Sequence, residues 1–166
     1  MQEPANERIQ AIYNLLIENK IDFTAMPHAP VYTIDEMAAL HLPNMETIAK
    51  NLFVRDDKKQ QYYLLVVREE KRVALKELRE RLGTRPLTFA SETDLLTILG
   101  LQRGAVTPFG VLNDRAHRTR VLIDATFSDS MIGIHPNENT ATVWLKTGDL
   151  VHLLRESGAE VEFLEF

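Results

Sequence analysis

The chain has 166 residues, 45% of them hydrophobic and 26% charged, which is an ordinary balance for a globular protein. Its formal net charge of −5 argues against nonspecific coating of nucleic acid, although a local basic face is compatible with it. The absence of cysteine excludes disulfides, thiol nucleophiles and cysteine-ligated zinc. No apolar run approaches the roughly 18 residues that span a bilayer, and the first residues lack an apolar signal core, so we expect a cytoplasmic protein.

The first half of the chain alternates between helical and extended patterns. Apolar residues recur at helical spacing over 6–19, and Thr33 with Glu36 forms a capping-box pattern before a short helix. The expected strand 60–67 contains a continuous apolar run from Tyr62 to Val67, which is typical of a strand buried on both faces. The turn residues 56–59 indicate that it forms a hairpin with the preceding strand. The expected elements are helix 6–19, strand 21–26, helix 33–40, a strand within 47–57, strand 60–67 and helix 74–83.

The second half continues in the same manner. Ser91 and Thr147 stand where helix caps are expected, and Gly100 and Gly158 follow the last turns of the two helices. The expected elements are strand 87–90, helix 91–100, strands 120–127, 131–135 and 140–145, helix 147–158 and strand 160–166.

This order of elements indicates the fold class. Strands and helices interleave without a regular βαβ repeat and without a glycine-rich nucleotide fingerprint. We therefore expect an α/β (α+β) protein with a mixed, mainly antiparallel central sheet surrounded by helices. The length favours a single domain over residues 1–166.

The segment 104–114, "GAVTPFGVLND", gathers several residues that determine the backbone conformation in one loop. Gly104, Pro108 and Gly110 lie within seven positions of a chain that holds only 7 glycines and 7 prolines. A turn needs fewer such residues, so this loop indicates a backbone that approaches a ligand closely.

Lys50 interrupts an apolar strand. Because alternate residues of a strand share a face, it points with Ile48 and Leu52, whereas Asn51 points the other way unless the strand is bulged. One interpretation is a lysine with its stem packed and its amine in water. The other is a cation at the rim of a pocket, ready to meet an anion.

The remaining polar candidates are weaker. His135 ends a strand before a proline, where it either bonds a turn or faces a site, and no ligand set for zinc stands near it in sequence. No serine occupies a nucleophile elbow. Glu69 with Glu70 is typical of a solvated turn. The basic segment 68–85 indicates a solvated helix face or a surface that contacts phosphate.

Several motifs together resemble a known family. The segments "AKNLFVRDD", "YYLLVV", "LTFAS", "LGLQRGAVTPFGVLND" and "IHPNENTATVWL" follow in the order found in the YbaK/prolyl-tRNA synthetase editing-domain family. Within it the chain looks most like the free-standing Ala-tRNA(Pro) deacylases, called PrdX or ProXp-ala. The resemblance extends from about residue 20 to residue 155, and the Lys-Asn pair together with the Gly-x-x-x-Pro loop carries it.

The resemblance implies roles for individual residues. Lys50 matches the lysine that engages the 3′-terminal part of the aminoacyl-tRNA, with Asn51 as its polar partner. Gly104 and Pro108 match the loop whose backbone positions the ester. These four are the expected catalytic residues. The residues expected to bind the substrate are Val31, Phe53, Thr107, Phe109 and His135.

The resemblance also implies an activity. It predicts a trans-editing deacylase that hydrolyses mischarged Ala-tRNA(Pro) and spares Pro-tRNA(Pro) by size exclusion, without a cofactor or a metal. A hydroxyl of the terminal ribose would help to activate the water. The acceptor end of the mischarged tRNA is the expected partner, prolyl-tRNA synthetase is a second candidate, and no membrane is involved. The alternatives are a deacylase for another small aminoacyl group, such as serine or cysteine, and a non-catalytic module that binds tRNA or an aminoacyl group.

Overall fold

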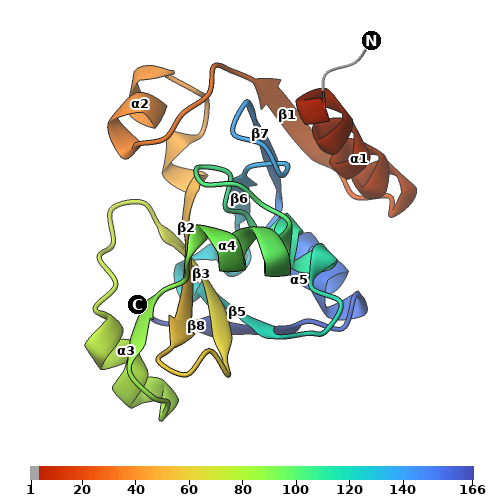
Figure 1. Cartoon of the computed structure of the whole chain (residues 1–166). Coiled ribbons are helices and arrows are strands. Elements are labelled where there is room, and N and C mark those ends of the chain that lie inside the picture. The colour runs from red at the N-terminus through yellow and green to blue at the C-terminus, as the bar shows by residue number, and fades with distance from the viewer. Residues whose placement is uncertain (1–3) are drawn as a thin grey trace.

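The strands of the protein form two sheets (Figure 1). The computed structural model describes residues 4–166, with side chains from residue 7 onward. The three-stranded sheet has the order β1-β7-β6 and the five-stranded sheet the order β4-β2-β3-β5-β8. The strands are β1 (Phe23–Pro27), β2 (Ala49–Asp56), β3 (Tyr62–Arg68), β4 (Leu87–Phe89), β5 (Thr119–Asp124), β6 (Met131–Ile134), β7 (Ala141–Lys146) and β8 (Glu160–Leu164).

Antiparallel pairs outnumber parallel ones. Both pairs of the small sheet are antiparallel, as are β2 with β3 and β2 with β4, whereas β3 with β5 and β5 with β8 are parallel. The expected mixed, mainly antiparallel α+β fold is confirmed, with its strands divided between two sheets rather than gathered in one. The expected hairpin is also present, and Asp56 holds its turn by accepting the N–H groups of Lys58 (3.1 Å) and Gln60 (2.8 Å).

Helices surround the sheets. The α-helices are α1 (Pro4–Glu18), α2 (Ile34–Ala39), α3 (Leu75–Leu82), α4 (Glu92–Asp94) and α5 (Thr147–Glu156). In Figure 1, α1 and α2 lie at the end that holds β1 and β7, and α3 lies at the other end beside the C-terminus. No helix within residues 4–166 is long and apolar enough to cross a membrane.

The helix ends agree with the sequence at two caps and differ at a third. Thr33 and Ser91 cap α2 and α4 by accepting the N–H groups of Glu36 and Asp94. The segment after α4 continues as a π-helix, Leu95–Leu99, rather than as an α-helix. The expected cap at Thr147 is wrong: α5 follows β7 so directly that Lys146 is the capping residue, and the Thr147 side chain is buried.

The strand β3 is the centre of the packing because both of its faces are buried, as its apolar run predicted. Tyr62, Leu64 and Val66 face the large core beneath α1, α5 and the π-helix. The alternate residues face a second core that includes Leu78 of α3. The two sheets meet where Ile48 forms a parallel bridge with Gly133 of β6. A third apolar cluster, formed by Val31, Met37, Leu42, Ile48 and Trp144, fills the space beside this seam.

Candidate active site

A cavity of about 240 Å³ opens beside this seam. Its walls come from five separate segments of the chain, which are 31–37, 48–51, Glu69, 104–106 and His135. Its lining includes Val31, Met37 and Ile48 of the third cluster together with polar residues such as Lys50 and His135. Residues that are distant in sequence therefore meet here because the two sheets are joined at Ile48 and Gly133.

Lys50 lies near the start of β2, on the same face as Leu52 and Val54, where it pairs with Val67 of β3. Its side chain is half-buried and lines the cavity. The Nζ atom donates a hydrogen bond to the backbone carbonyl of Lys71. Ile48, by contrast, precedes the strand and turns toward Gly133. Lys50 therefore brings a positive charge to the cavity wall, with one of its three donors already engaged.

Asn51 also lines the cavity, although it lies on the opposite face of the strand from Lys50. Its side-chain oxygen is buried, and among residues 7–166 it has no hydrogen-bond partner. A buried acceptor without a partner carries a cost of roughly 1–3 kcal/mol. A bound ligand that donated a hydrogen bond would remove that cost.

Gly104 has a left-handed backbone with φ of +86° and lies against the ring of Tyr32. A Cβ atom here would lie 2.8 Å from Cδ1 of Tyr32, so the loop can pass the ring only as glycine. Asn139, which sequence reasoning missed, donates from Nδ2 to the carbonyl of Val31 (2.8 Å) and lies beside Gly104. Within the described chain, no acceptor is found for the N–H groups of Gly104 and Val106.

His135 is half-buried and has a fixed orientation. Its Nδ1 lies 2.9 Å from the carbonyl of Ala141, so this nitrogen carries the proton and Nε2 is left as an acceptor. Burial lowers the pKa of His135, the hydrogen bond to Ala141 acts against this, and neighbouring His28 adds to the lowering. The two rings lie 6.0 Å apart. His135 is therefore a neutral imidazole at neutral pH.

Glu69 is a lining residue that sequence reasoning assigned to a solvated turn. It follows the last residue of β3 and is only half-exposed. Burial, and then the charge of Glu70, raise the pKa of Glu69, while the charge of Lys50 acts in the opposite direction. The solvated-turn interpretation is correct for the exposed Glu70 but incomplete for Glu69, which is half-exposed and lines the cavity.

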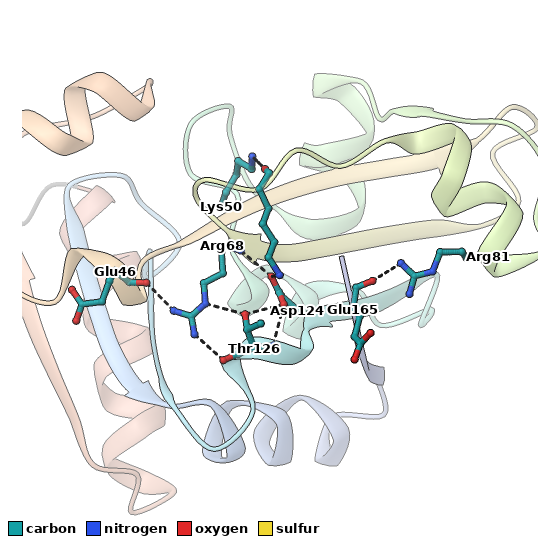
Figure 2. A network of polar contacts seen from close by, with 8 residues as sticks. Glu46, Lys50, Arg68, Arg81, Asp124, Thr126 and Glu165 are labelled. Atoms are coloured by element: carbon teal, nitrogen blue, oxygen red, sulfur yellow. Dashed lines mark hydrogen bonds and ion pairs between the residues drawn. The ribbon is translucent and has the colours of Figure 1, made fainter.

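A polar network holds this turn in place (Figure 2). Asp124 is fully buried and accepts from the Lys71 ammonium group (2.8 Å), from Thr126 and from the Arg68 N–H. Burial alone would raise the pKa of Asp124, but these hydrogen bonds outweigh it and hold the pKa below its ordinary value. The Arg68 guanidinium bonds the carbonyls of Glu46 (2.8 Å) and Thr126 (2.7 Å). Both ends of the turn 68–71 are thus tied to one buried carboxylate.

The other predicted site residues lie apart from the cavity wall or enter it only in part. Val31 lines the cavity through the third apolar cluster. Phe53 and Phe109 lie in the large core, where Phe53 stacks on Tyr62. Thr107 and Pro108 follow the loop 104–106 in sequence and are buried. Pro108 begins a 3₁₀ turn, so its contribution is to direct the backbone rather than to line the cavity.

Comparison with known proteins identifies the family. Residues 28–153 match the model of the aminoacyl-tRNA editing domain. The chain belongs to the aminoacyl-tRNA editing domain family. This match covers all the segments that form the cavity, and it confirms the resemblance found in the sequence.

Individual members of the editing-domain family extend the match over nearly the whole chain. The prolyl-tRNA editing protein ProX of Acetoanaerobium sticklandii is 41% identical over 157 residues, which are 94% of this chain and 96% of that protein. The prolyl-tRNA synthetase associated domain-containing protein 1 of Danio rerio is 33% identical over 150 residues, 88% of this chain and 80% of that protein. A crystal structure described as a candidate trans-editing enzyme for prolyl-tRNA synthetase has the same fold, with a TM-score of 0.71 at 20% identity, over 100% of this chain and 99% of that one.

Proposed function

We propose that this editing domain is a trans-editing deacylase that hydrolyses the ester of Ala-tRNA(Pro) and spares Pro-tRNA(Pro). The observation that carries the proposal is the cavity, which gathers Lys50, Asn51, Gly104 and His135 in a chain 41% identical to a prolyl-tRNA editing protein. The tRNA would enter with its acceptor end, and prolyl-tRNA synthetase would supply the mischarged molecule.

The packed apolar residues in the wall of the cavity support a small aminoacyl group. Val31, Met37 and Ile48 belong to a packed cluster and can yield little to an added ring. A synthetase that accepts proline cannot strongly reject alanine, because a missing methylene is worth only ~1–3 kcal/mol. A second site that excludes proline by overlap corrects this error.

The polar wall supports ester hydrolysis. In the proposed reaction, water attacks the ester carbonyl, the bond between this carbon and the ribose oxygen breaks, and alanine and uncharged tRNA leave. The unengaged N–H groups of Gly104 and Val106 are suited to stabilise the developing oxyanion. Lys50 would hold the 3′-terminal phosphate by charge, and Asn51 would accept a hydrogen bond from the ribose.

Activation of the water needs a proton acceptor. A hydroxyl of the terminal ribose would help to activate the water, as the family resemblance implies, and neutral His135 offers Nε2 to orient that hydroxyl or the water. An aminoacyl ester is already reactive, so correct positioning supplies much of the rate.

The test is a deacylation assay with tRNA(Pro) carrying alanine, proline, serine or cysteine. We expect kcat/KM for alanine to exceed that for proline by a few hundred-fold, since a steric penalty of ~3–4 kcal/mol gives that ratio. Preference for serine or cysteine would indicate a deacylase of different specificity. Binding without turnover of any substrate would indicate a non-catalytic module. Addition of prolyl-tRNA synthetase to the same assay measures whether the partner is needed.

A further inference from the structure

Glu69 lines the cavity, and its carboxylate has no protein partner among the described residues. Among the residues that line the cavity, Lys50 carries the positive charge and Glu69 the negative one. Within the part of the chain that the structure describes, no hydrogen bond or ion pair to Glu69 is found. A half-buried carboxylate in this position has lost part of its hydration and has gained no partner in return.

The geometry of the turn keeps Glu69 and Lys50 from neutralising each other. The Lys50 amine is engaged by the carbonyl of Lys71 rather than by Glu69. The Lys71 ammonium group is in turn engaged by buried Asp124, 2.8 Å away. Both neighbouring lysines are therefore directed to other acceptors, and the Glu69 carboxylate remains available to a cation that enters the cavity.

The proposed substrate brings such a cation. An aminoacyl ester carries an α-ammonium group one carbon away from the carbonyl that reacts. We propose that Glu69 binds this α-ammonium group and so orients the ester toward Gly104. The inference rests on the proposed function, because it assigns a contact within that same site. It also predicts that an aminoacyl group with a blocked amine, as in peptidyl-tRNA, loses this contact.

The experiment compares two substrates of nearly equal size. Treatment of Ala-tRNA(Pro) with nitrous acid replaces the ammonium group by a hydroxyl and gives lactyl-tRNA(Pro). The kcat/KM of the wild type, Glu69→Gln and Glu70→Gln proteins is measured on both. Because the intrinsic reactivity of each ester is the same for all three proteins, it cancels when each variant is compared with the wild type on one substrate.

The expected result is selective. Glu69→Gln should lower kcat/KM for Ala-tRNA(Pro) by about 10- to 100-fold, as is usual for a lost charge-assisted hydrogen bond, and by less than about threefold for lactyl-tRNA(Pro). Glu70→Gln, which removes a neighbouring exposed charge, should change neither. An equal loss on both substrates would assign Glu69 to proton transfer or to structure and would overturn the proposal, as would no loss on either.

A separate binding measurement keeps this inference distinct from the proposed function. If the wild type hydrolyses neither ester, the proposed deacylase activity fails. Glu69 is then tested by the Kd for 3′-alanylamino-3′-deoxyadenosine and for its lactyl counterpart. A preference for the alanyl compound that Glu69→Gln removes would support the ammonium contact. Equal Kd values in the wild type would overturn it.

Discussion

Lys50 donates a hydrogen bond from Nζ to the backbone carbonyl of Lys71, so the position of its charge depends on a turn 21 residues further along the chain. This contact fixes one donor and leaves two for a ligand. The side chain is half-buried and adds charge to the cavity rather than volume to a core.

Replacement of Lys50 by alanine is therefore expected to remove activity and leave the fold intact. We expect kcat/KM on Ala-tRNA(Pro) to fall at least 100-fold, with a melting temperature within a few degrees of the wild type. The matched control is Lys76→Ala, which removes an exposed lysine from α3. Normal turnover by a folded Lys50→Ala protein would refute the role of this lysine.

The Asp124–Lys71 ion pair is expected to contribute to stability and to the position of Lys50. Asp124→Asn leaves the Lys71 ammonium group, which is 26% exposed, without its charged partner, and should cost about 2–4 kcal/mol in the free energy of unfolding. Urea denaturation at pH 7 measures this. Asp57→Asn, which breaks an exposed pair with Arg85, serves as the control and should cost less.

The same pair gives a pH dependence with a defined sign. The pKa of Asp124 is lowered in the folded protein, so its contribution is complete above the ordinary aspartate value of ~3.9 and is lost as pH falls through the folded pKa. The difference in stability between the wild type and Asp124→Asn should therefore shrink in acid. A constant difference from pH 7 to pH 2 would show that the variant acts through packing instead.

Gly104 is expected to be required for activity for two reasons, the close contact with Tyr32 and the left-handed backbone, and these can be tested separately. Gly104→Ala and Gly104→Val place a Cβ atom 2.8 Å from Tyr32 and also strain a backbone with φ of +86°. In a Tyr32→Ala background the contact is gone and only the strain remains. We expect Gly104→Val to lower kcat/KM more than it lowers stability, and we expect partial recovery of Gly104→Ala when Tyr32 is also truncated. Undiminished deacylation by folded Gly104→Val would contradict the proposed role of the loop.

His135 is expected to be neutral and to limit the size of the aminoacyl group. Because its pKa is lowered, the unfolded chain binds more protons between the folded pKa and about 6.5, and the stability that His135 contributes is lost as pH falls through this window. His135→Ala should be free of this dependence, whereas the exposed His152→Ala should retain it. Urea denaturation between pH 5 and pH 7.5 measures both.

Selectivity provides the second measurement on His135. If its ring limits the pocket, His135→Ala should lower the ratio of kcat/KM for Ala-tRNA(Pro) to that for Pro-tRNA(Pro) by raising activity on proline. An equal loss on both substrates would assign the ring to orientation or chemistry. Similar cleavage of both by the wild type would refute size exclusion.

Local features of the fold could be predicted from the sequence because local physics determines them. The hairpin of β2 and β3, the caps at Thr33 and Ser91, and the doubly buried strand 62–68 each leave a pattern within a short stretch of sequence. The division into two sheets depends on contacts between distant segments, such as the bridge from Ile48 to Gly133. No local pattern in the chain encodes that contact.

The cavity residues also divide into those that local sequence could predict and those that depend on distant contacts. Lys50, Gly104 and His135 have unusual local surroundings and could be selected from the sequence, and the structure brings all three to one wall. Glu69 could not be distinguished from Glu70, because both follow a strand end and the turn is fixed by contacts with distant residues, among them the buried Asp124. Asn139 and Val31 lie 108 positions apart, so no local pattern in the sequence predicts their hydrogen bond.

A substitution at Gly133 would act on the cavity without altering any residue that lines it. A Cβ atom at this position would lie 2.8 Å from Nε1 of Trp144 and 3.0 Å from Cγ1 of Ile48, so a larger residue would displace these two side chains. Ile48 belongs to the cavity wall, whereas Gly133 lies behind it. A protein with a larger residue here would have a displaced Ile48 in the cavity wall, while every lining residue kept its identity. Divergence in specificity would then be recorded at a position that a comparison of active-site residues alone omits.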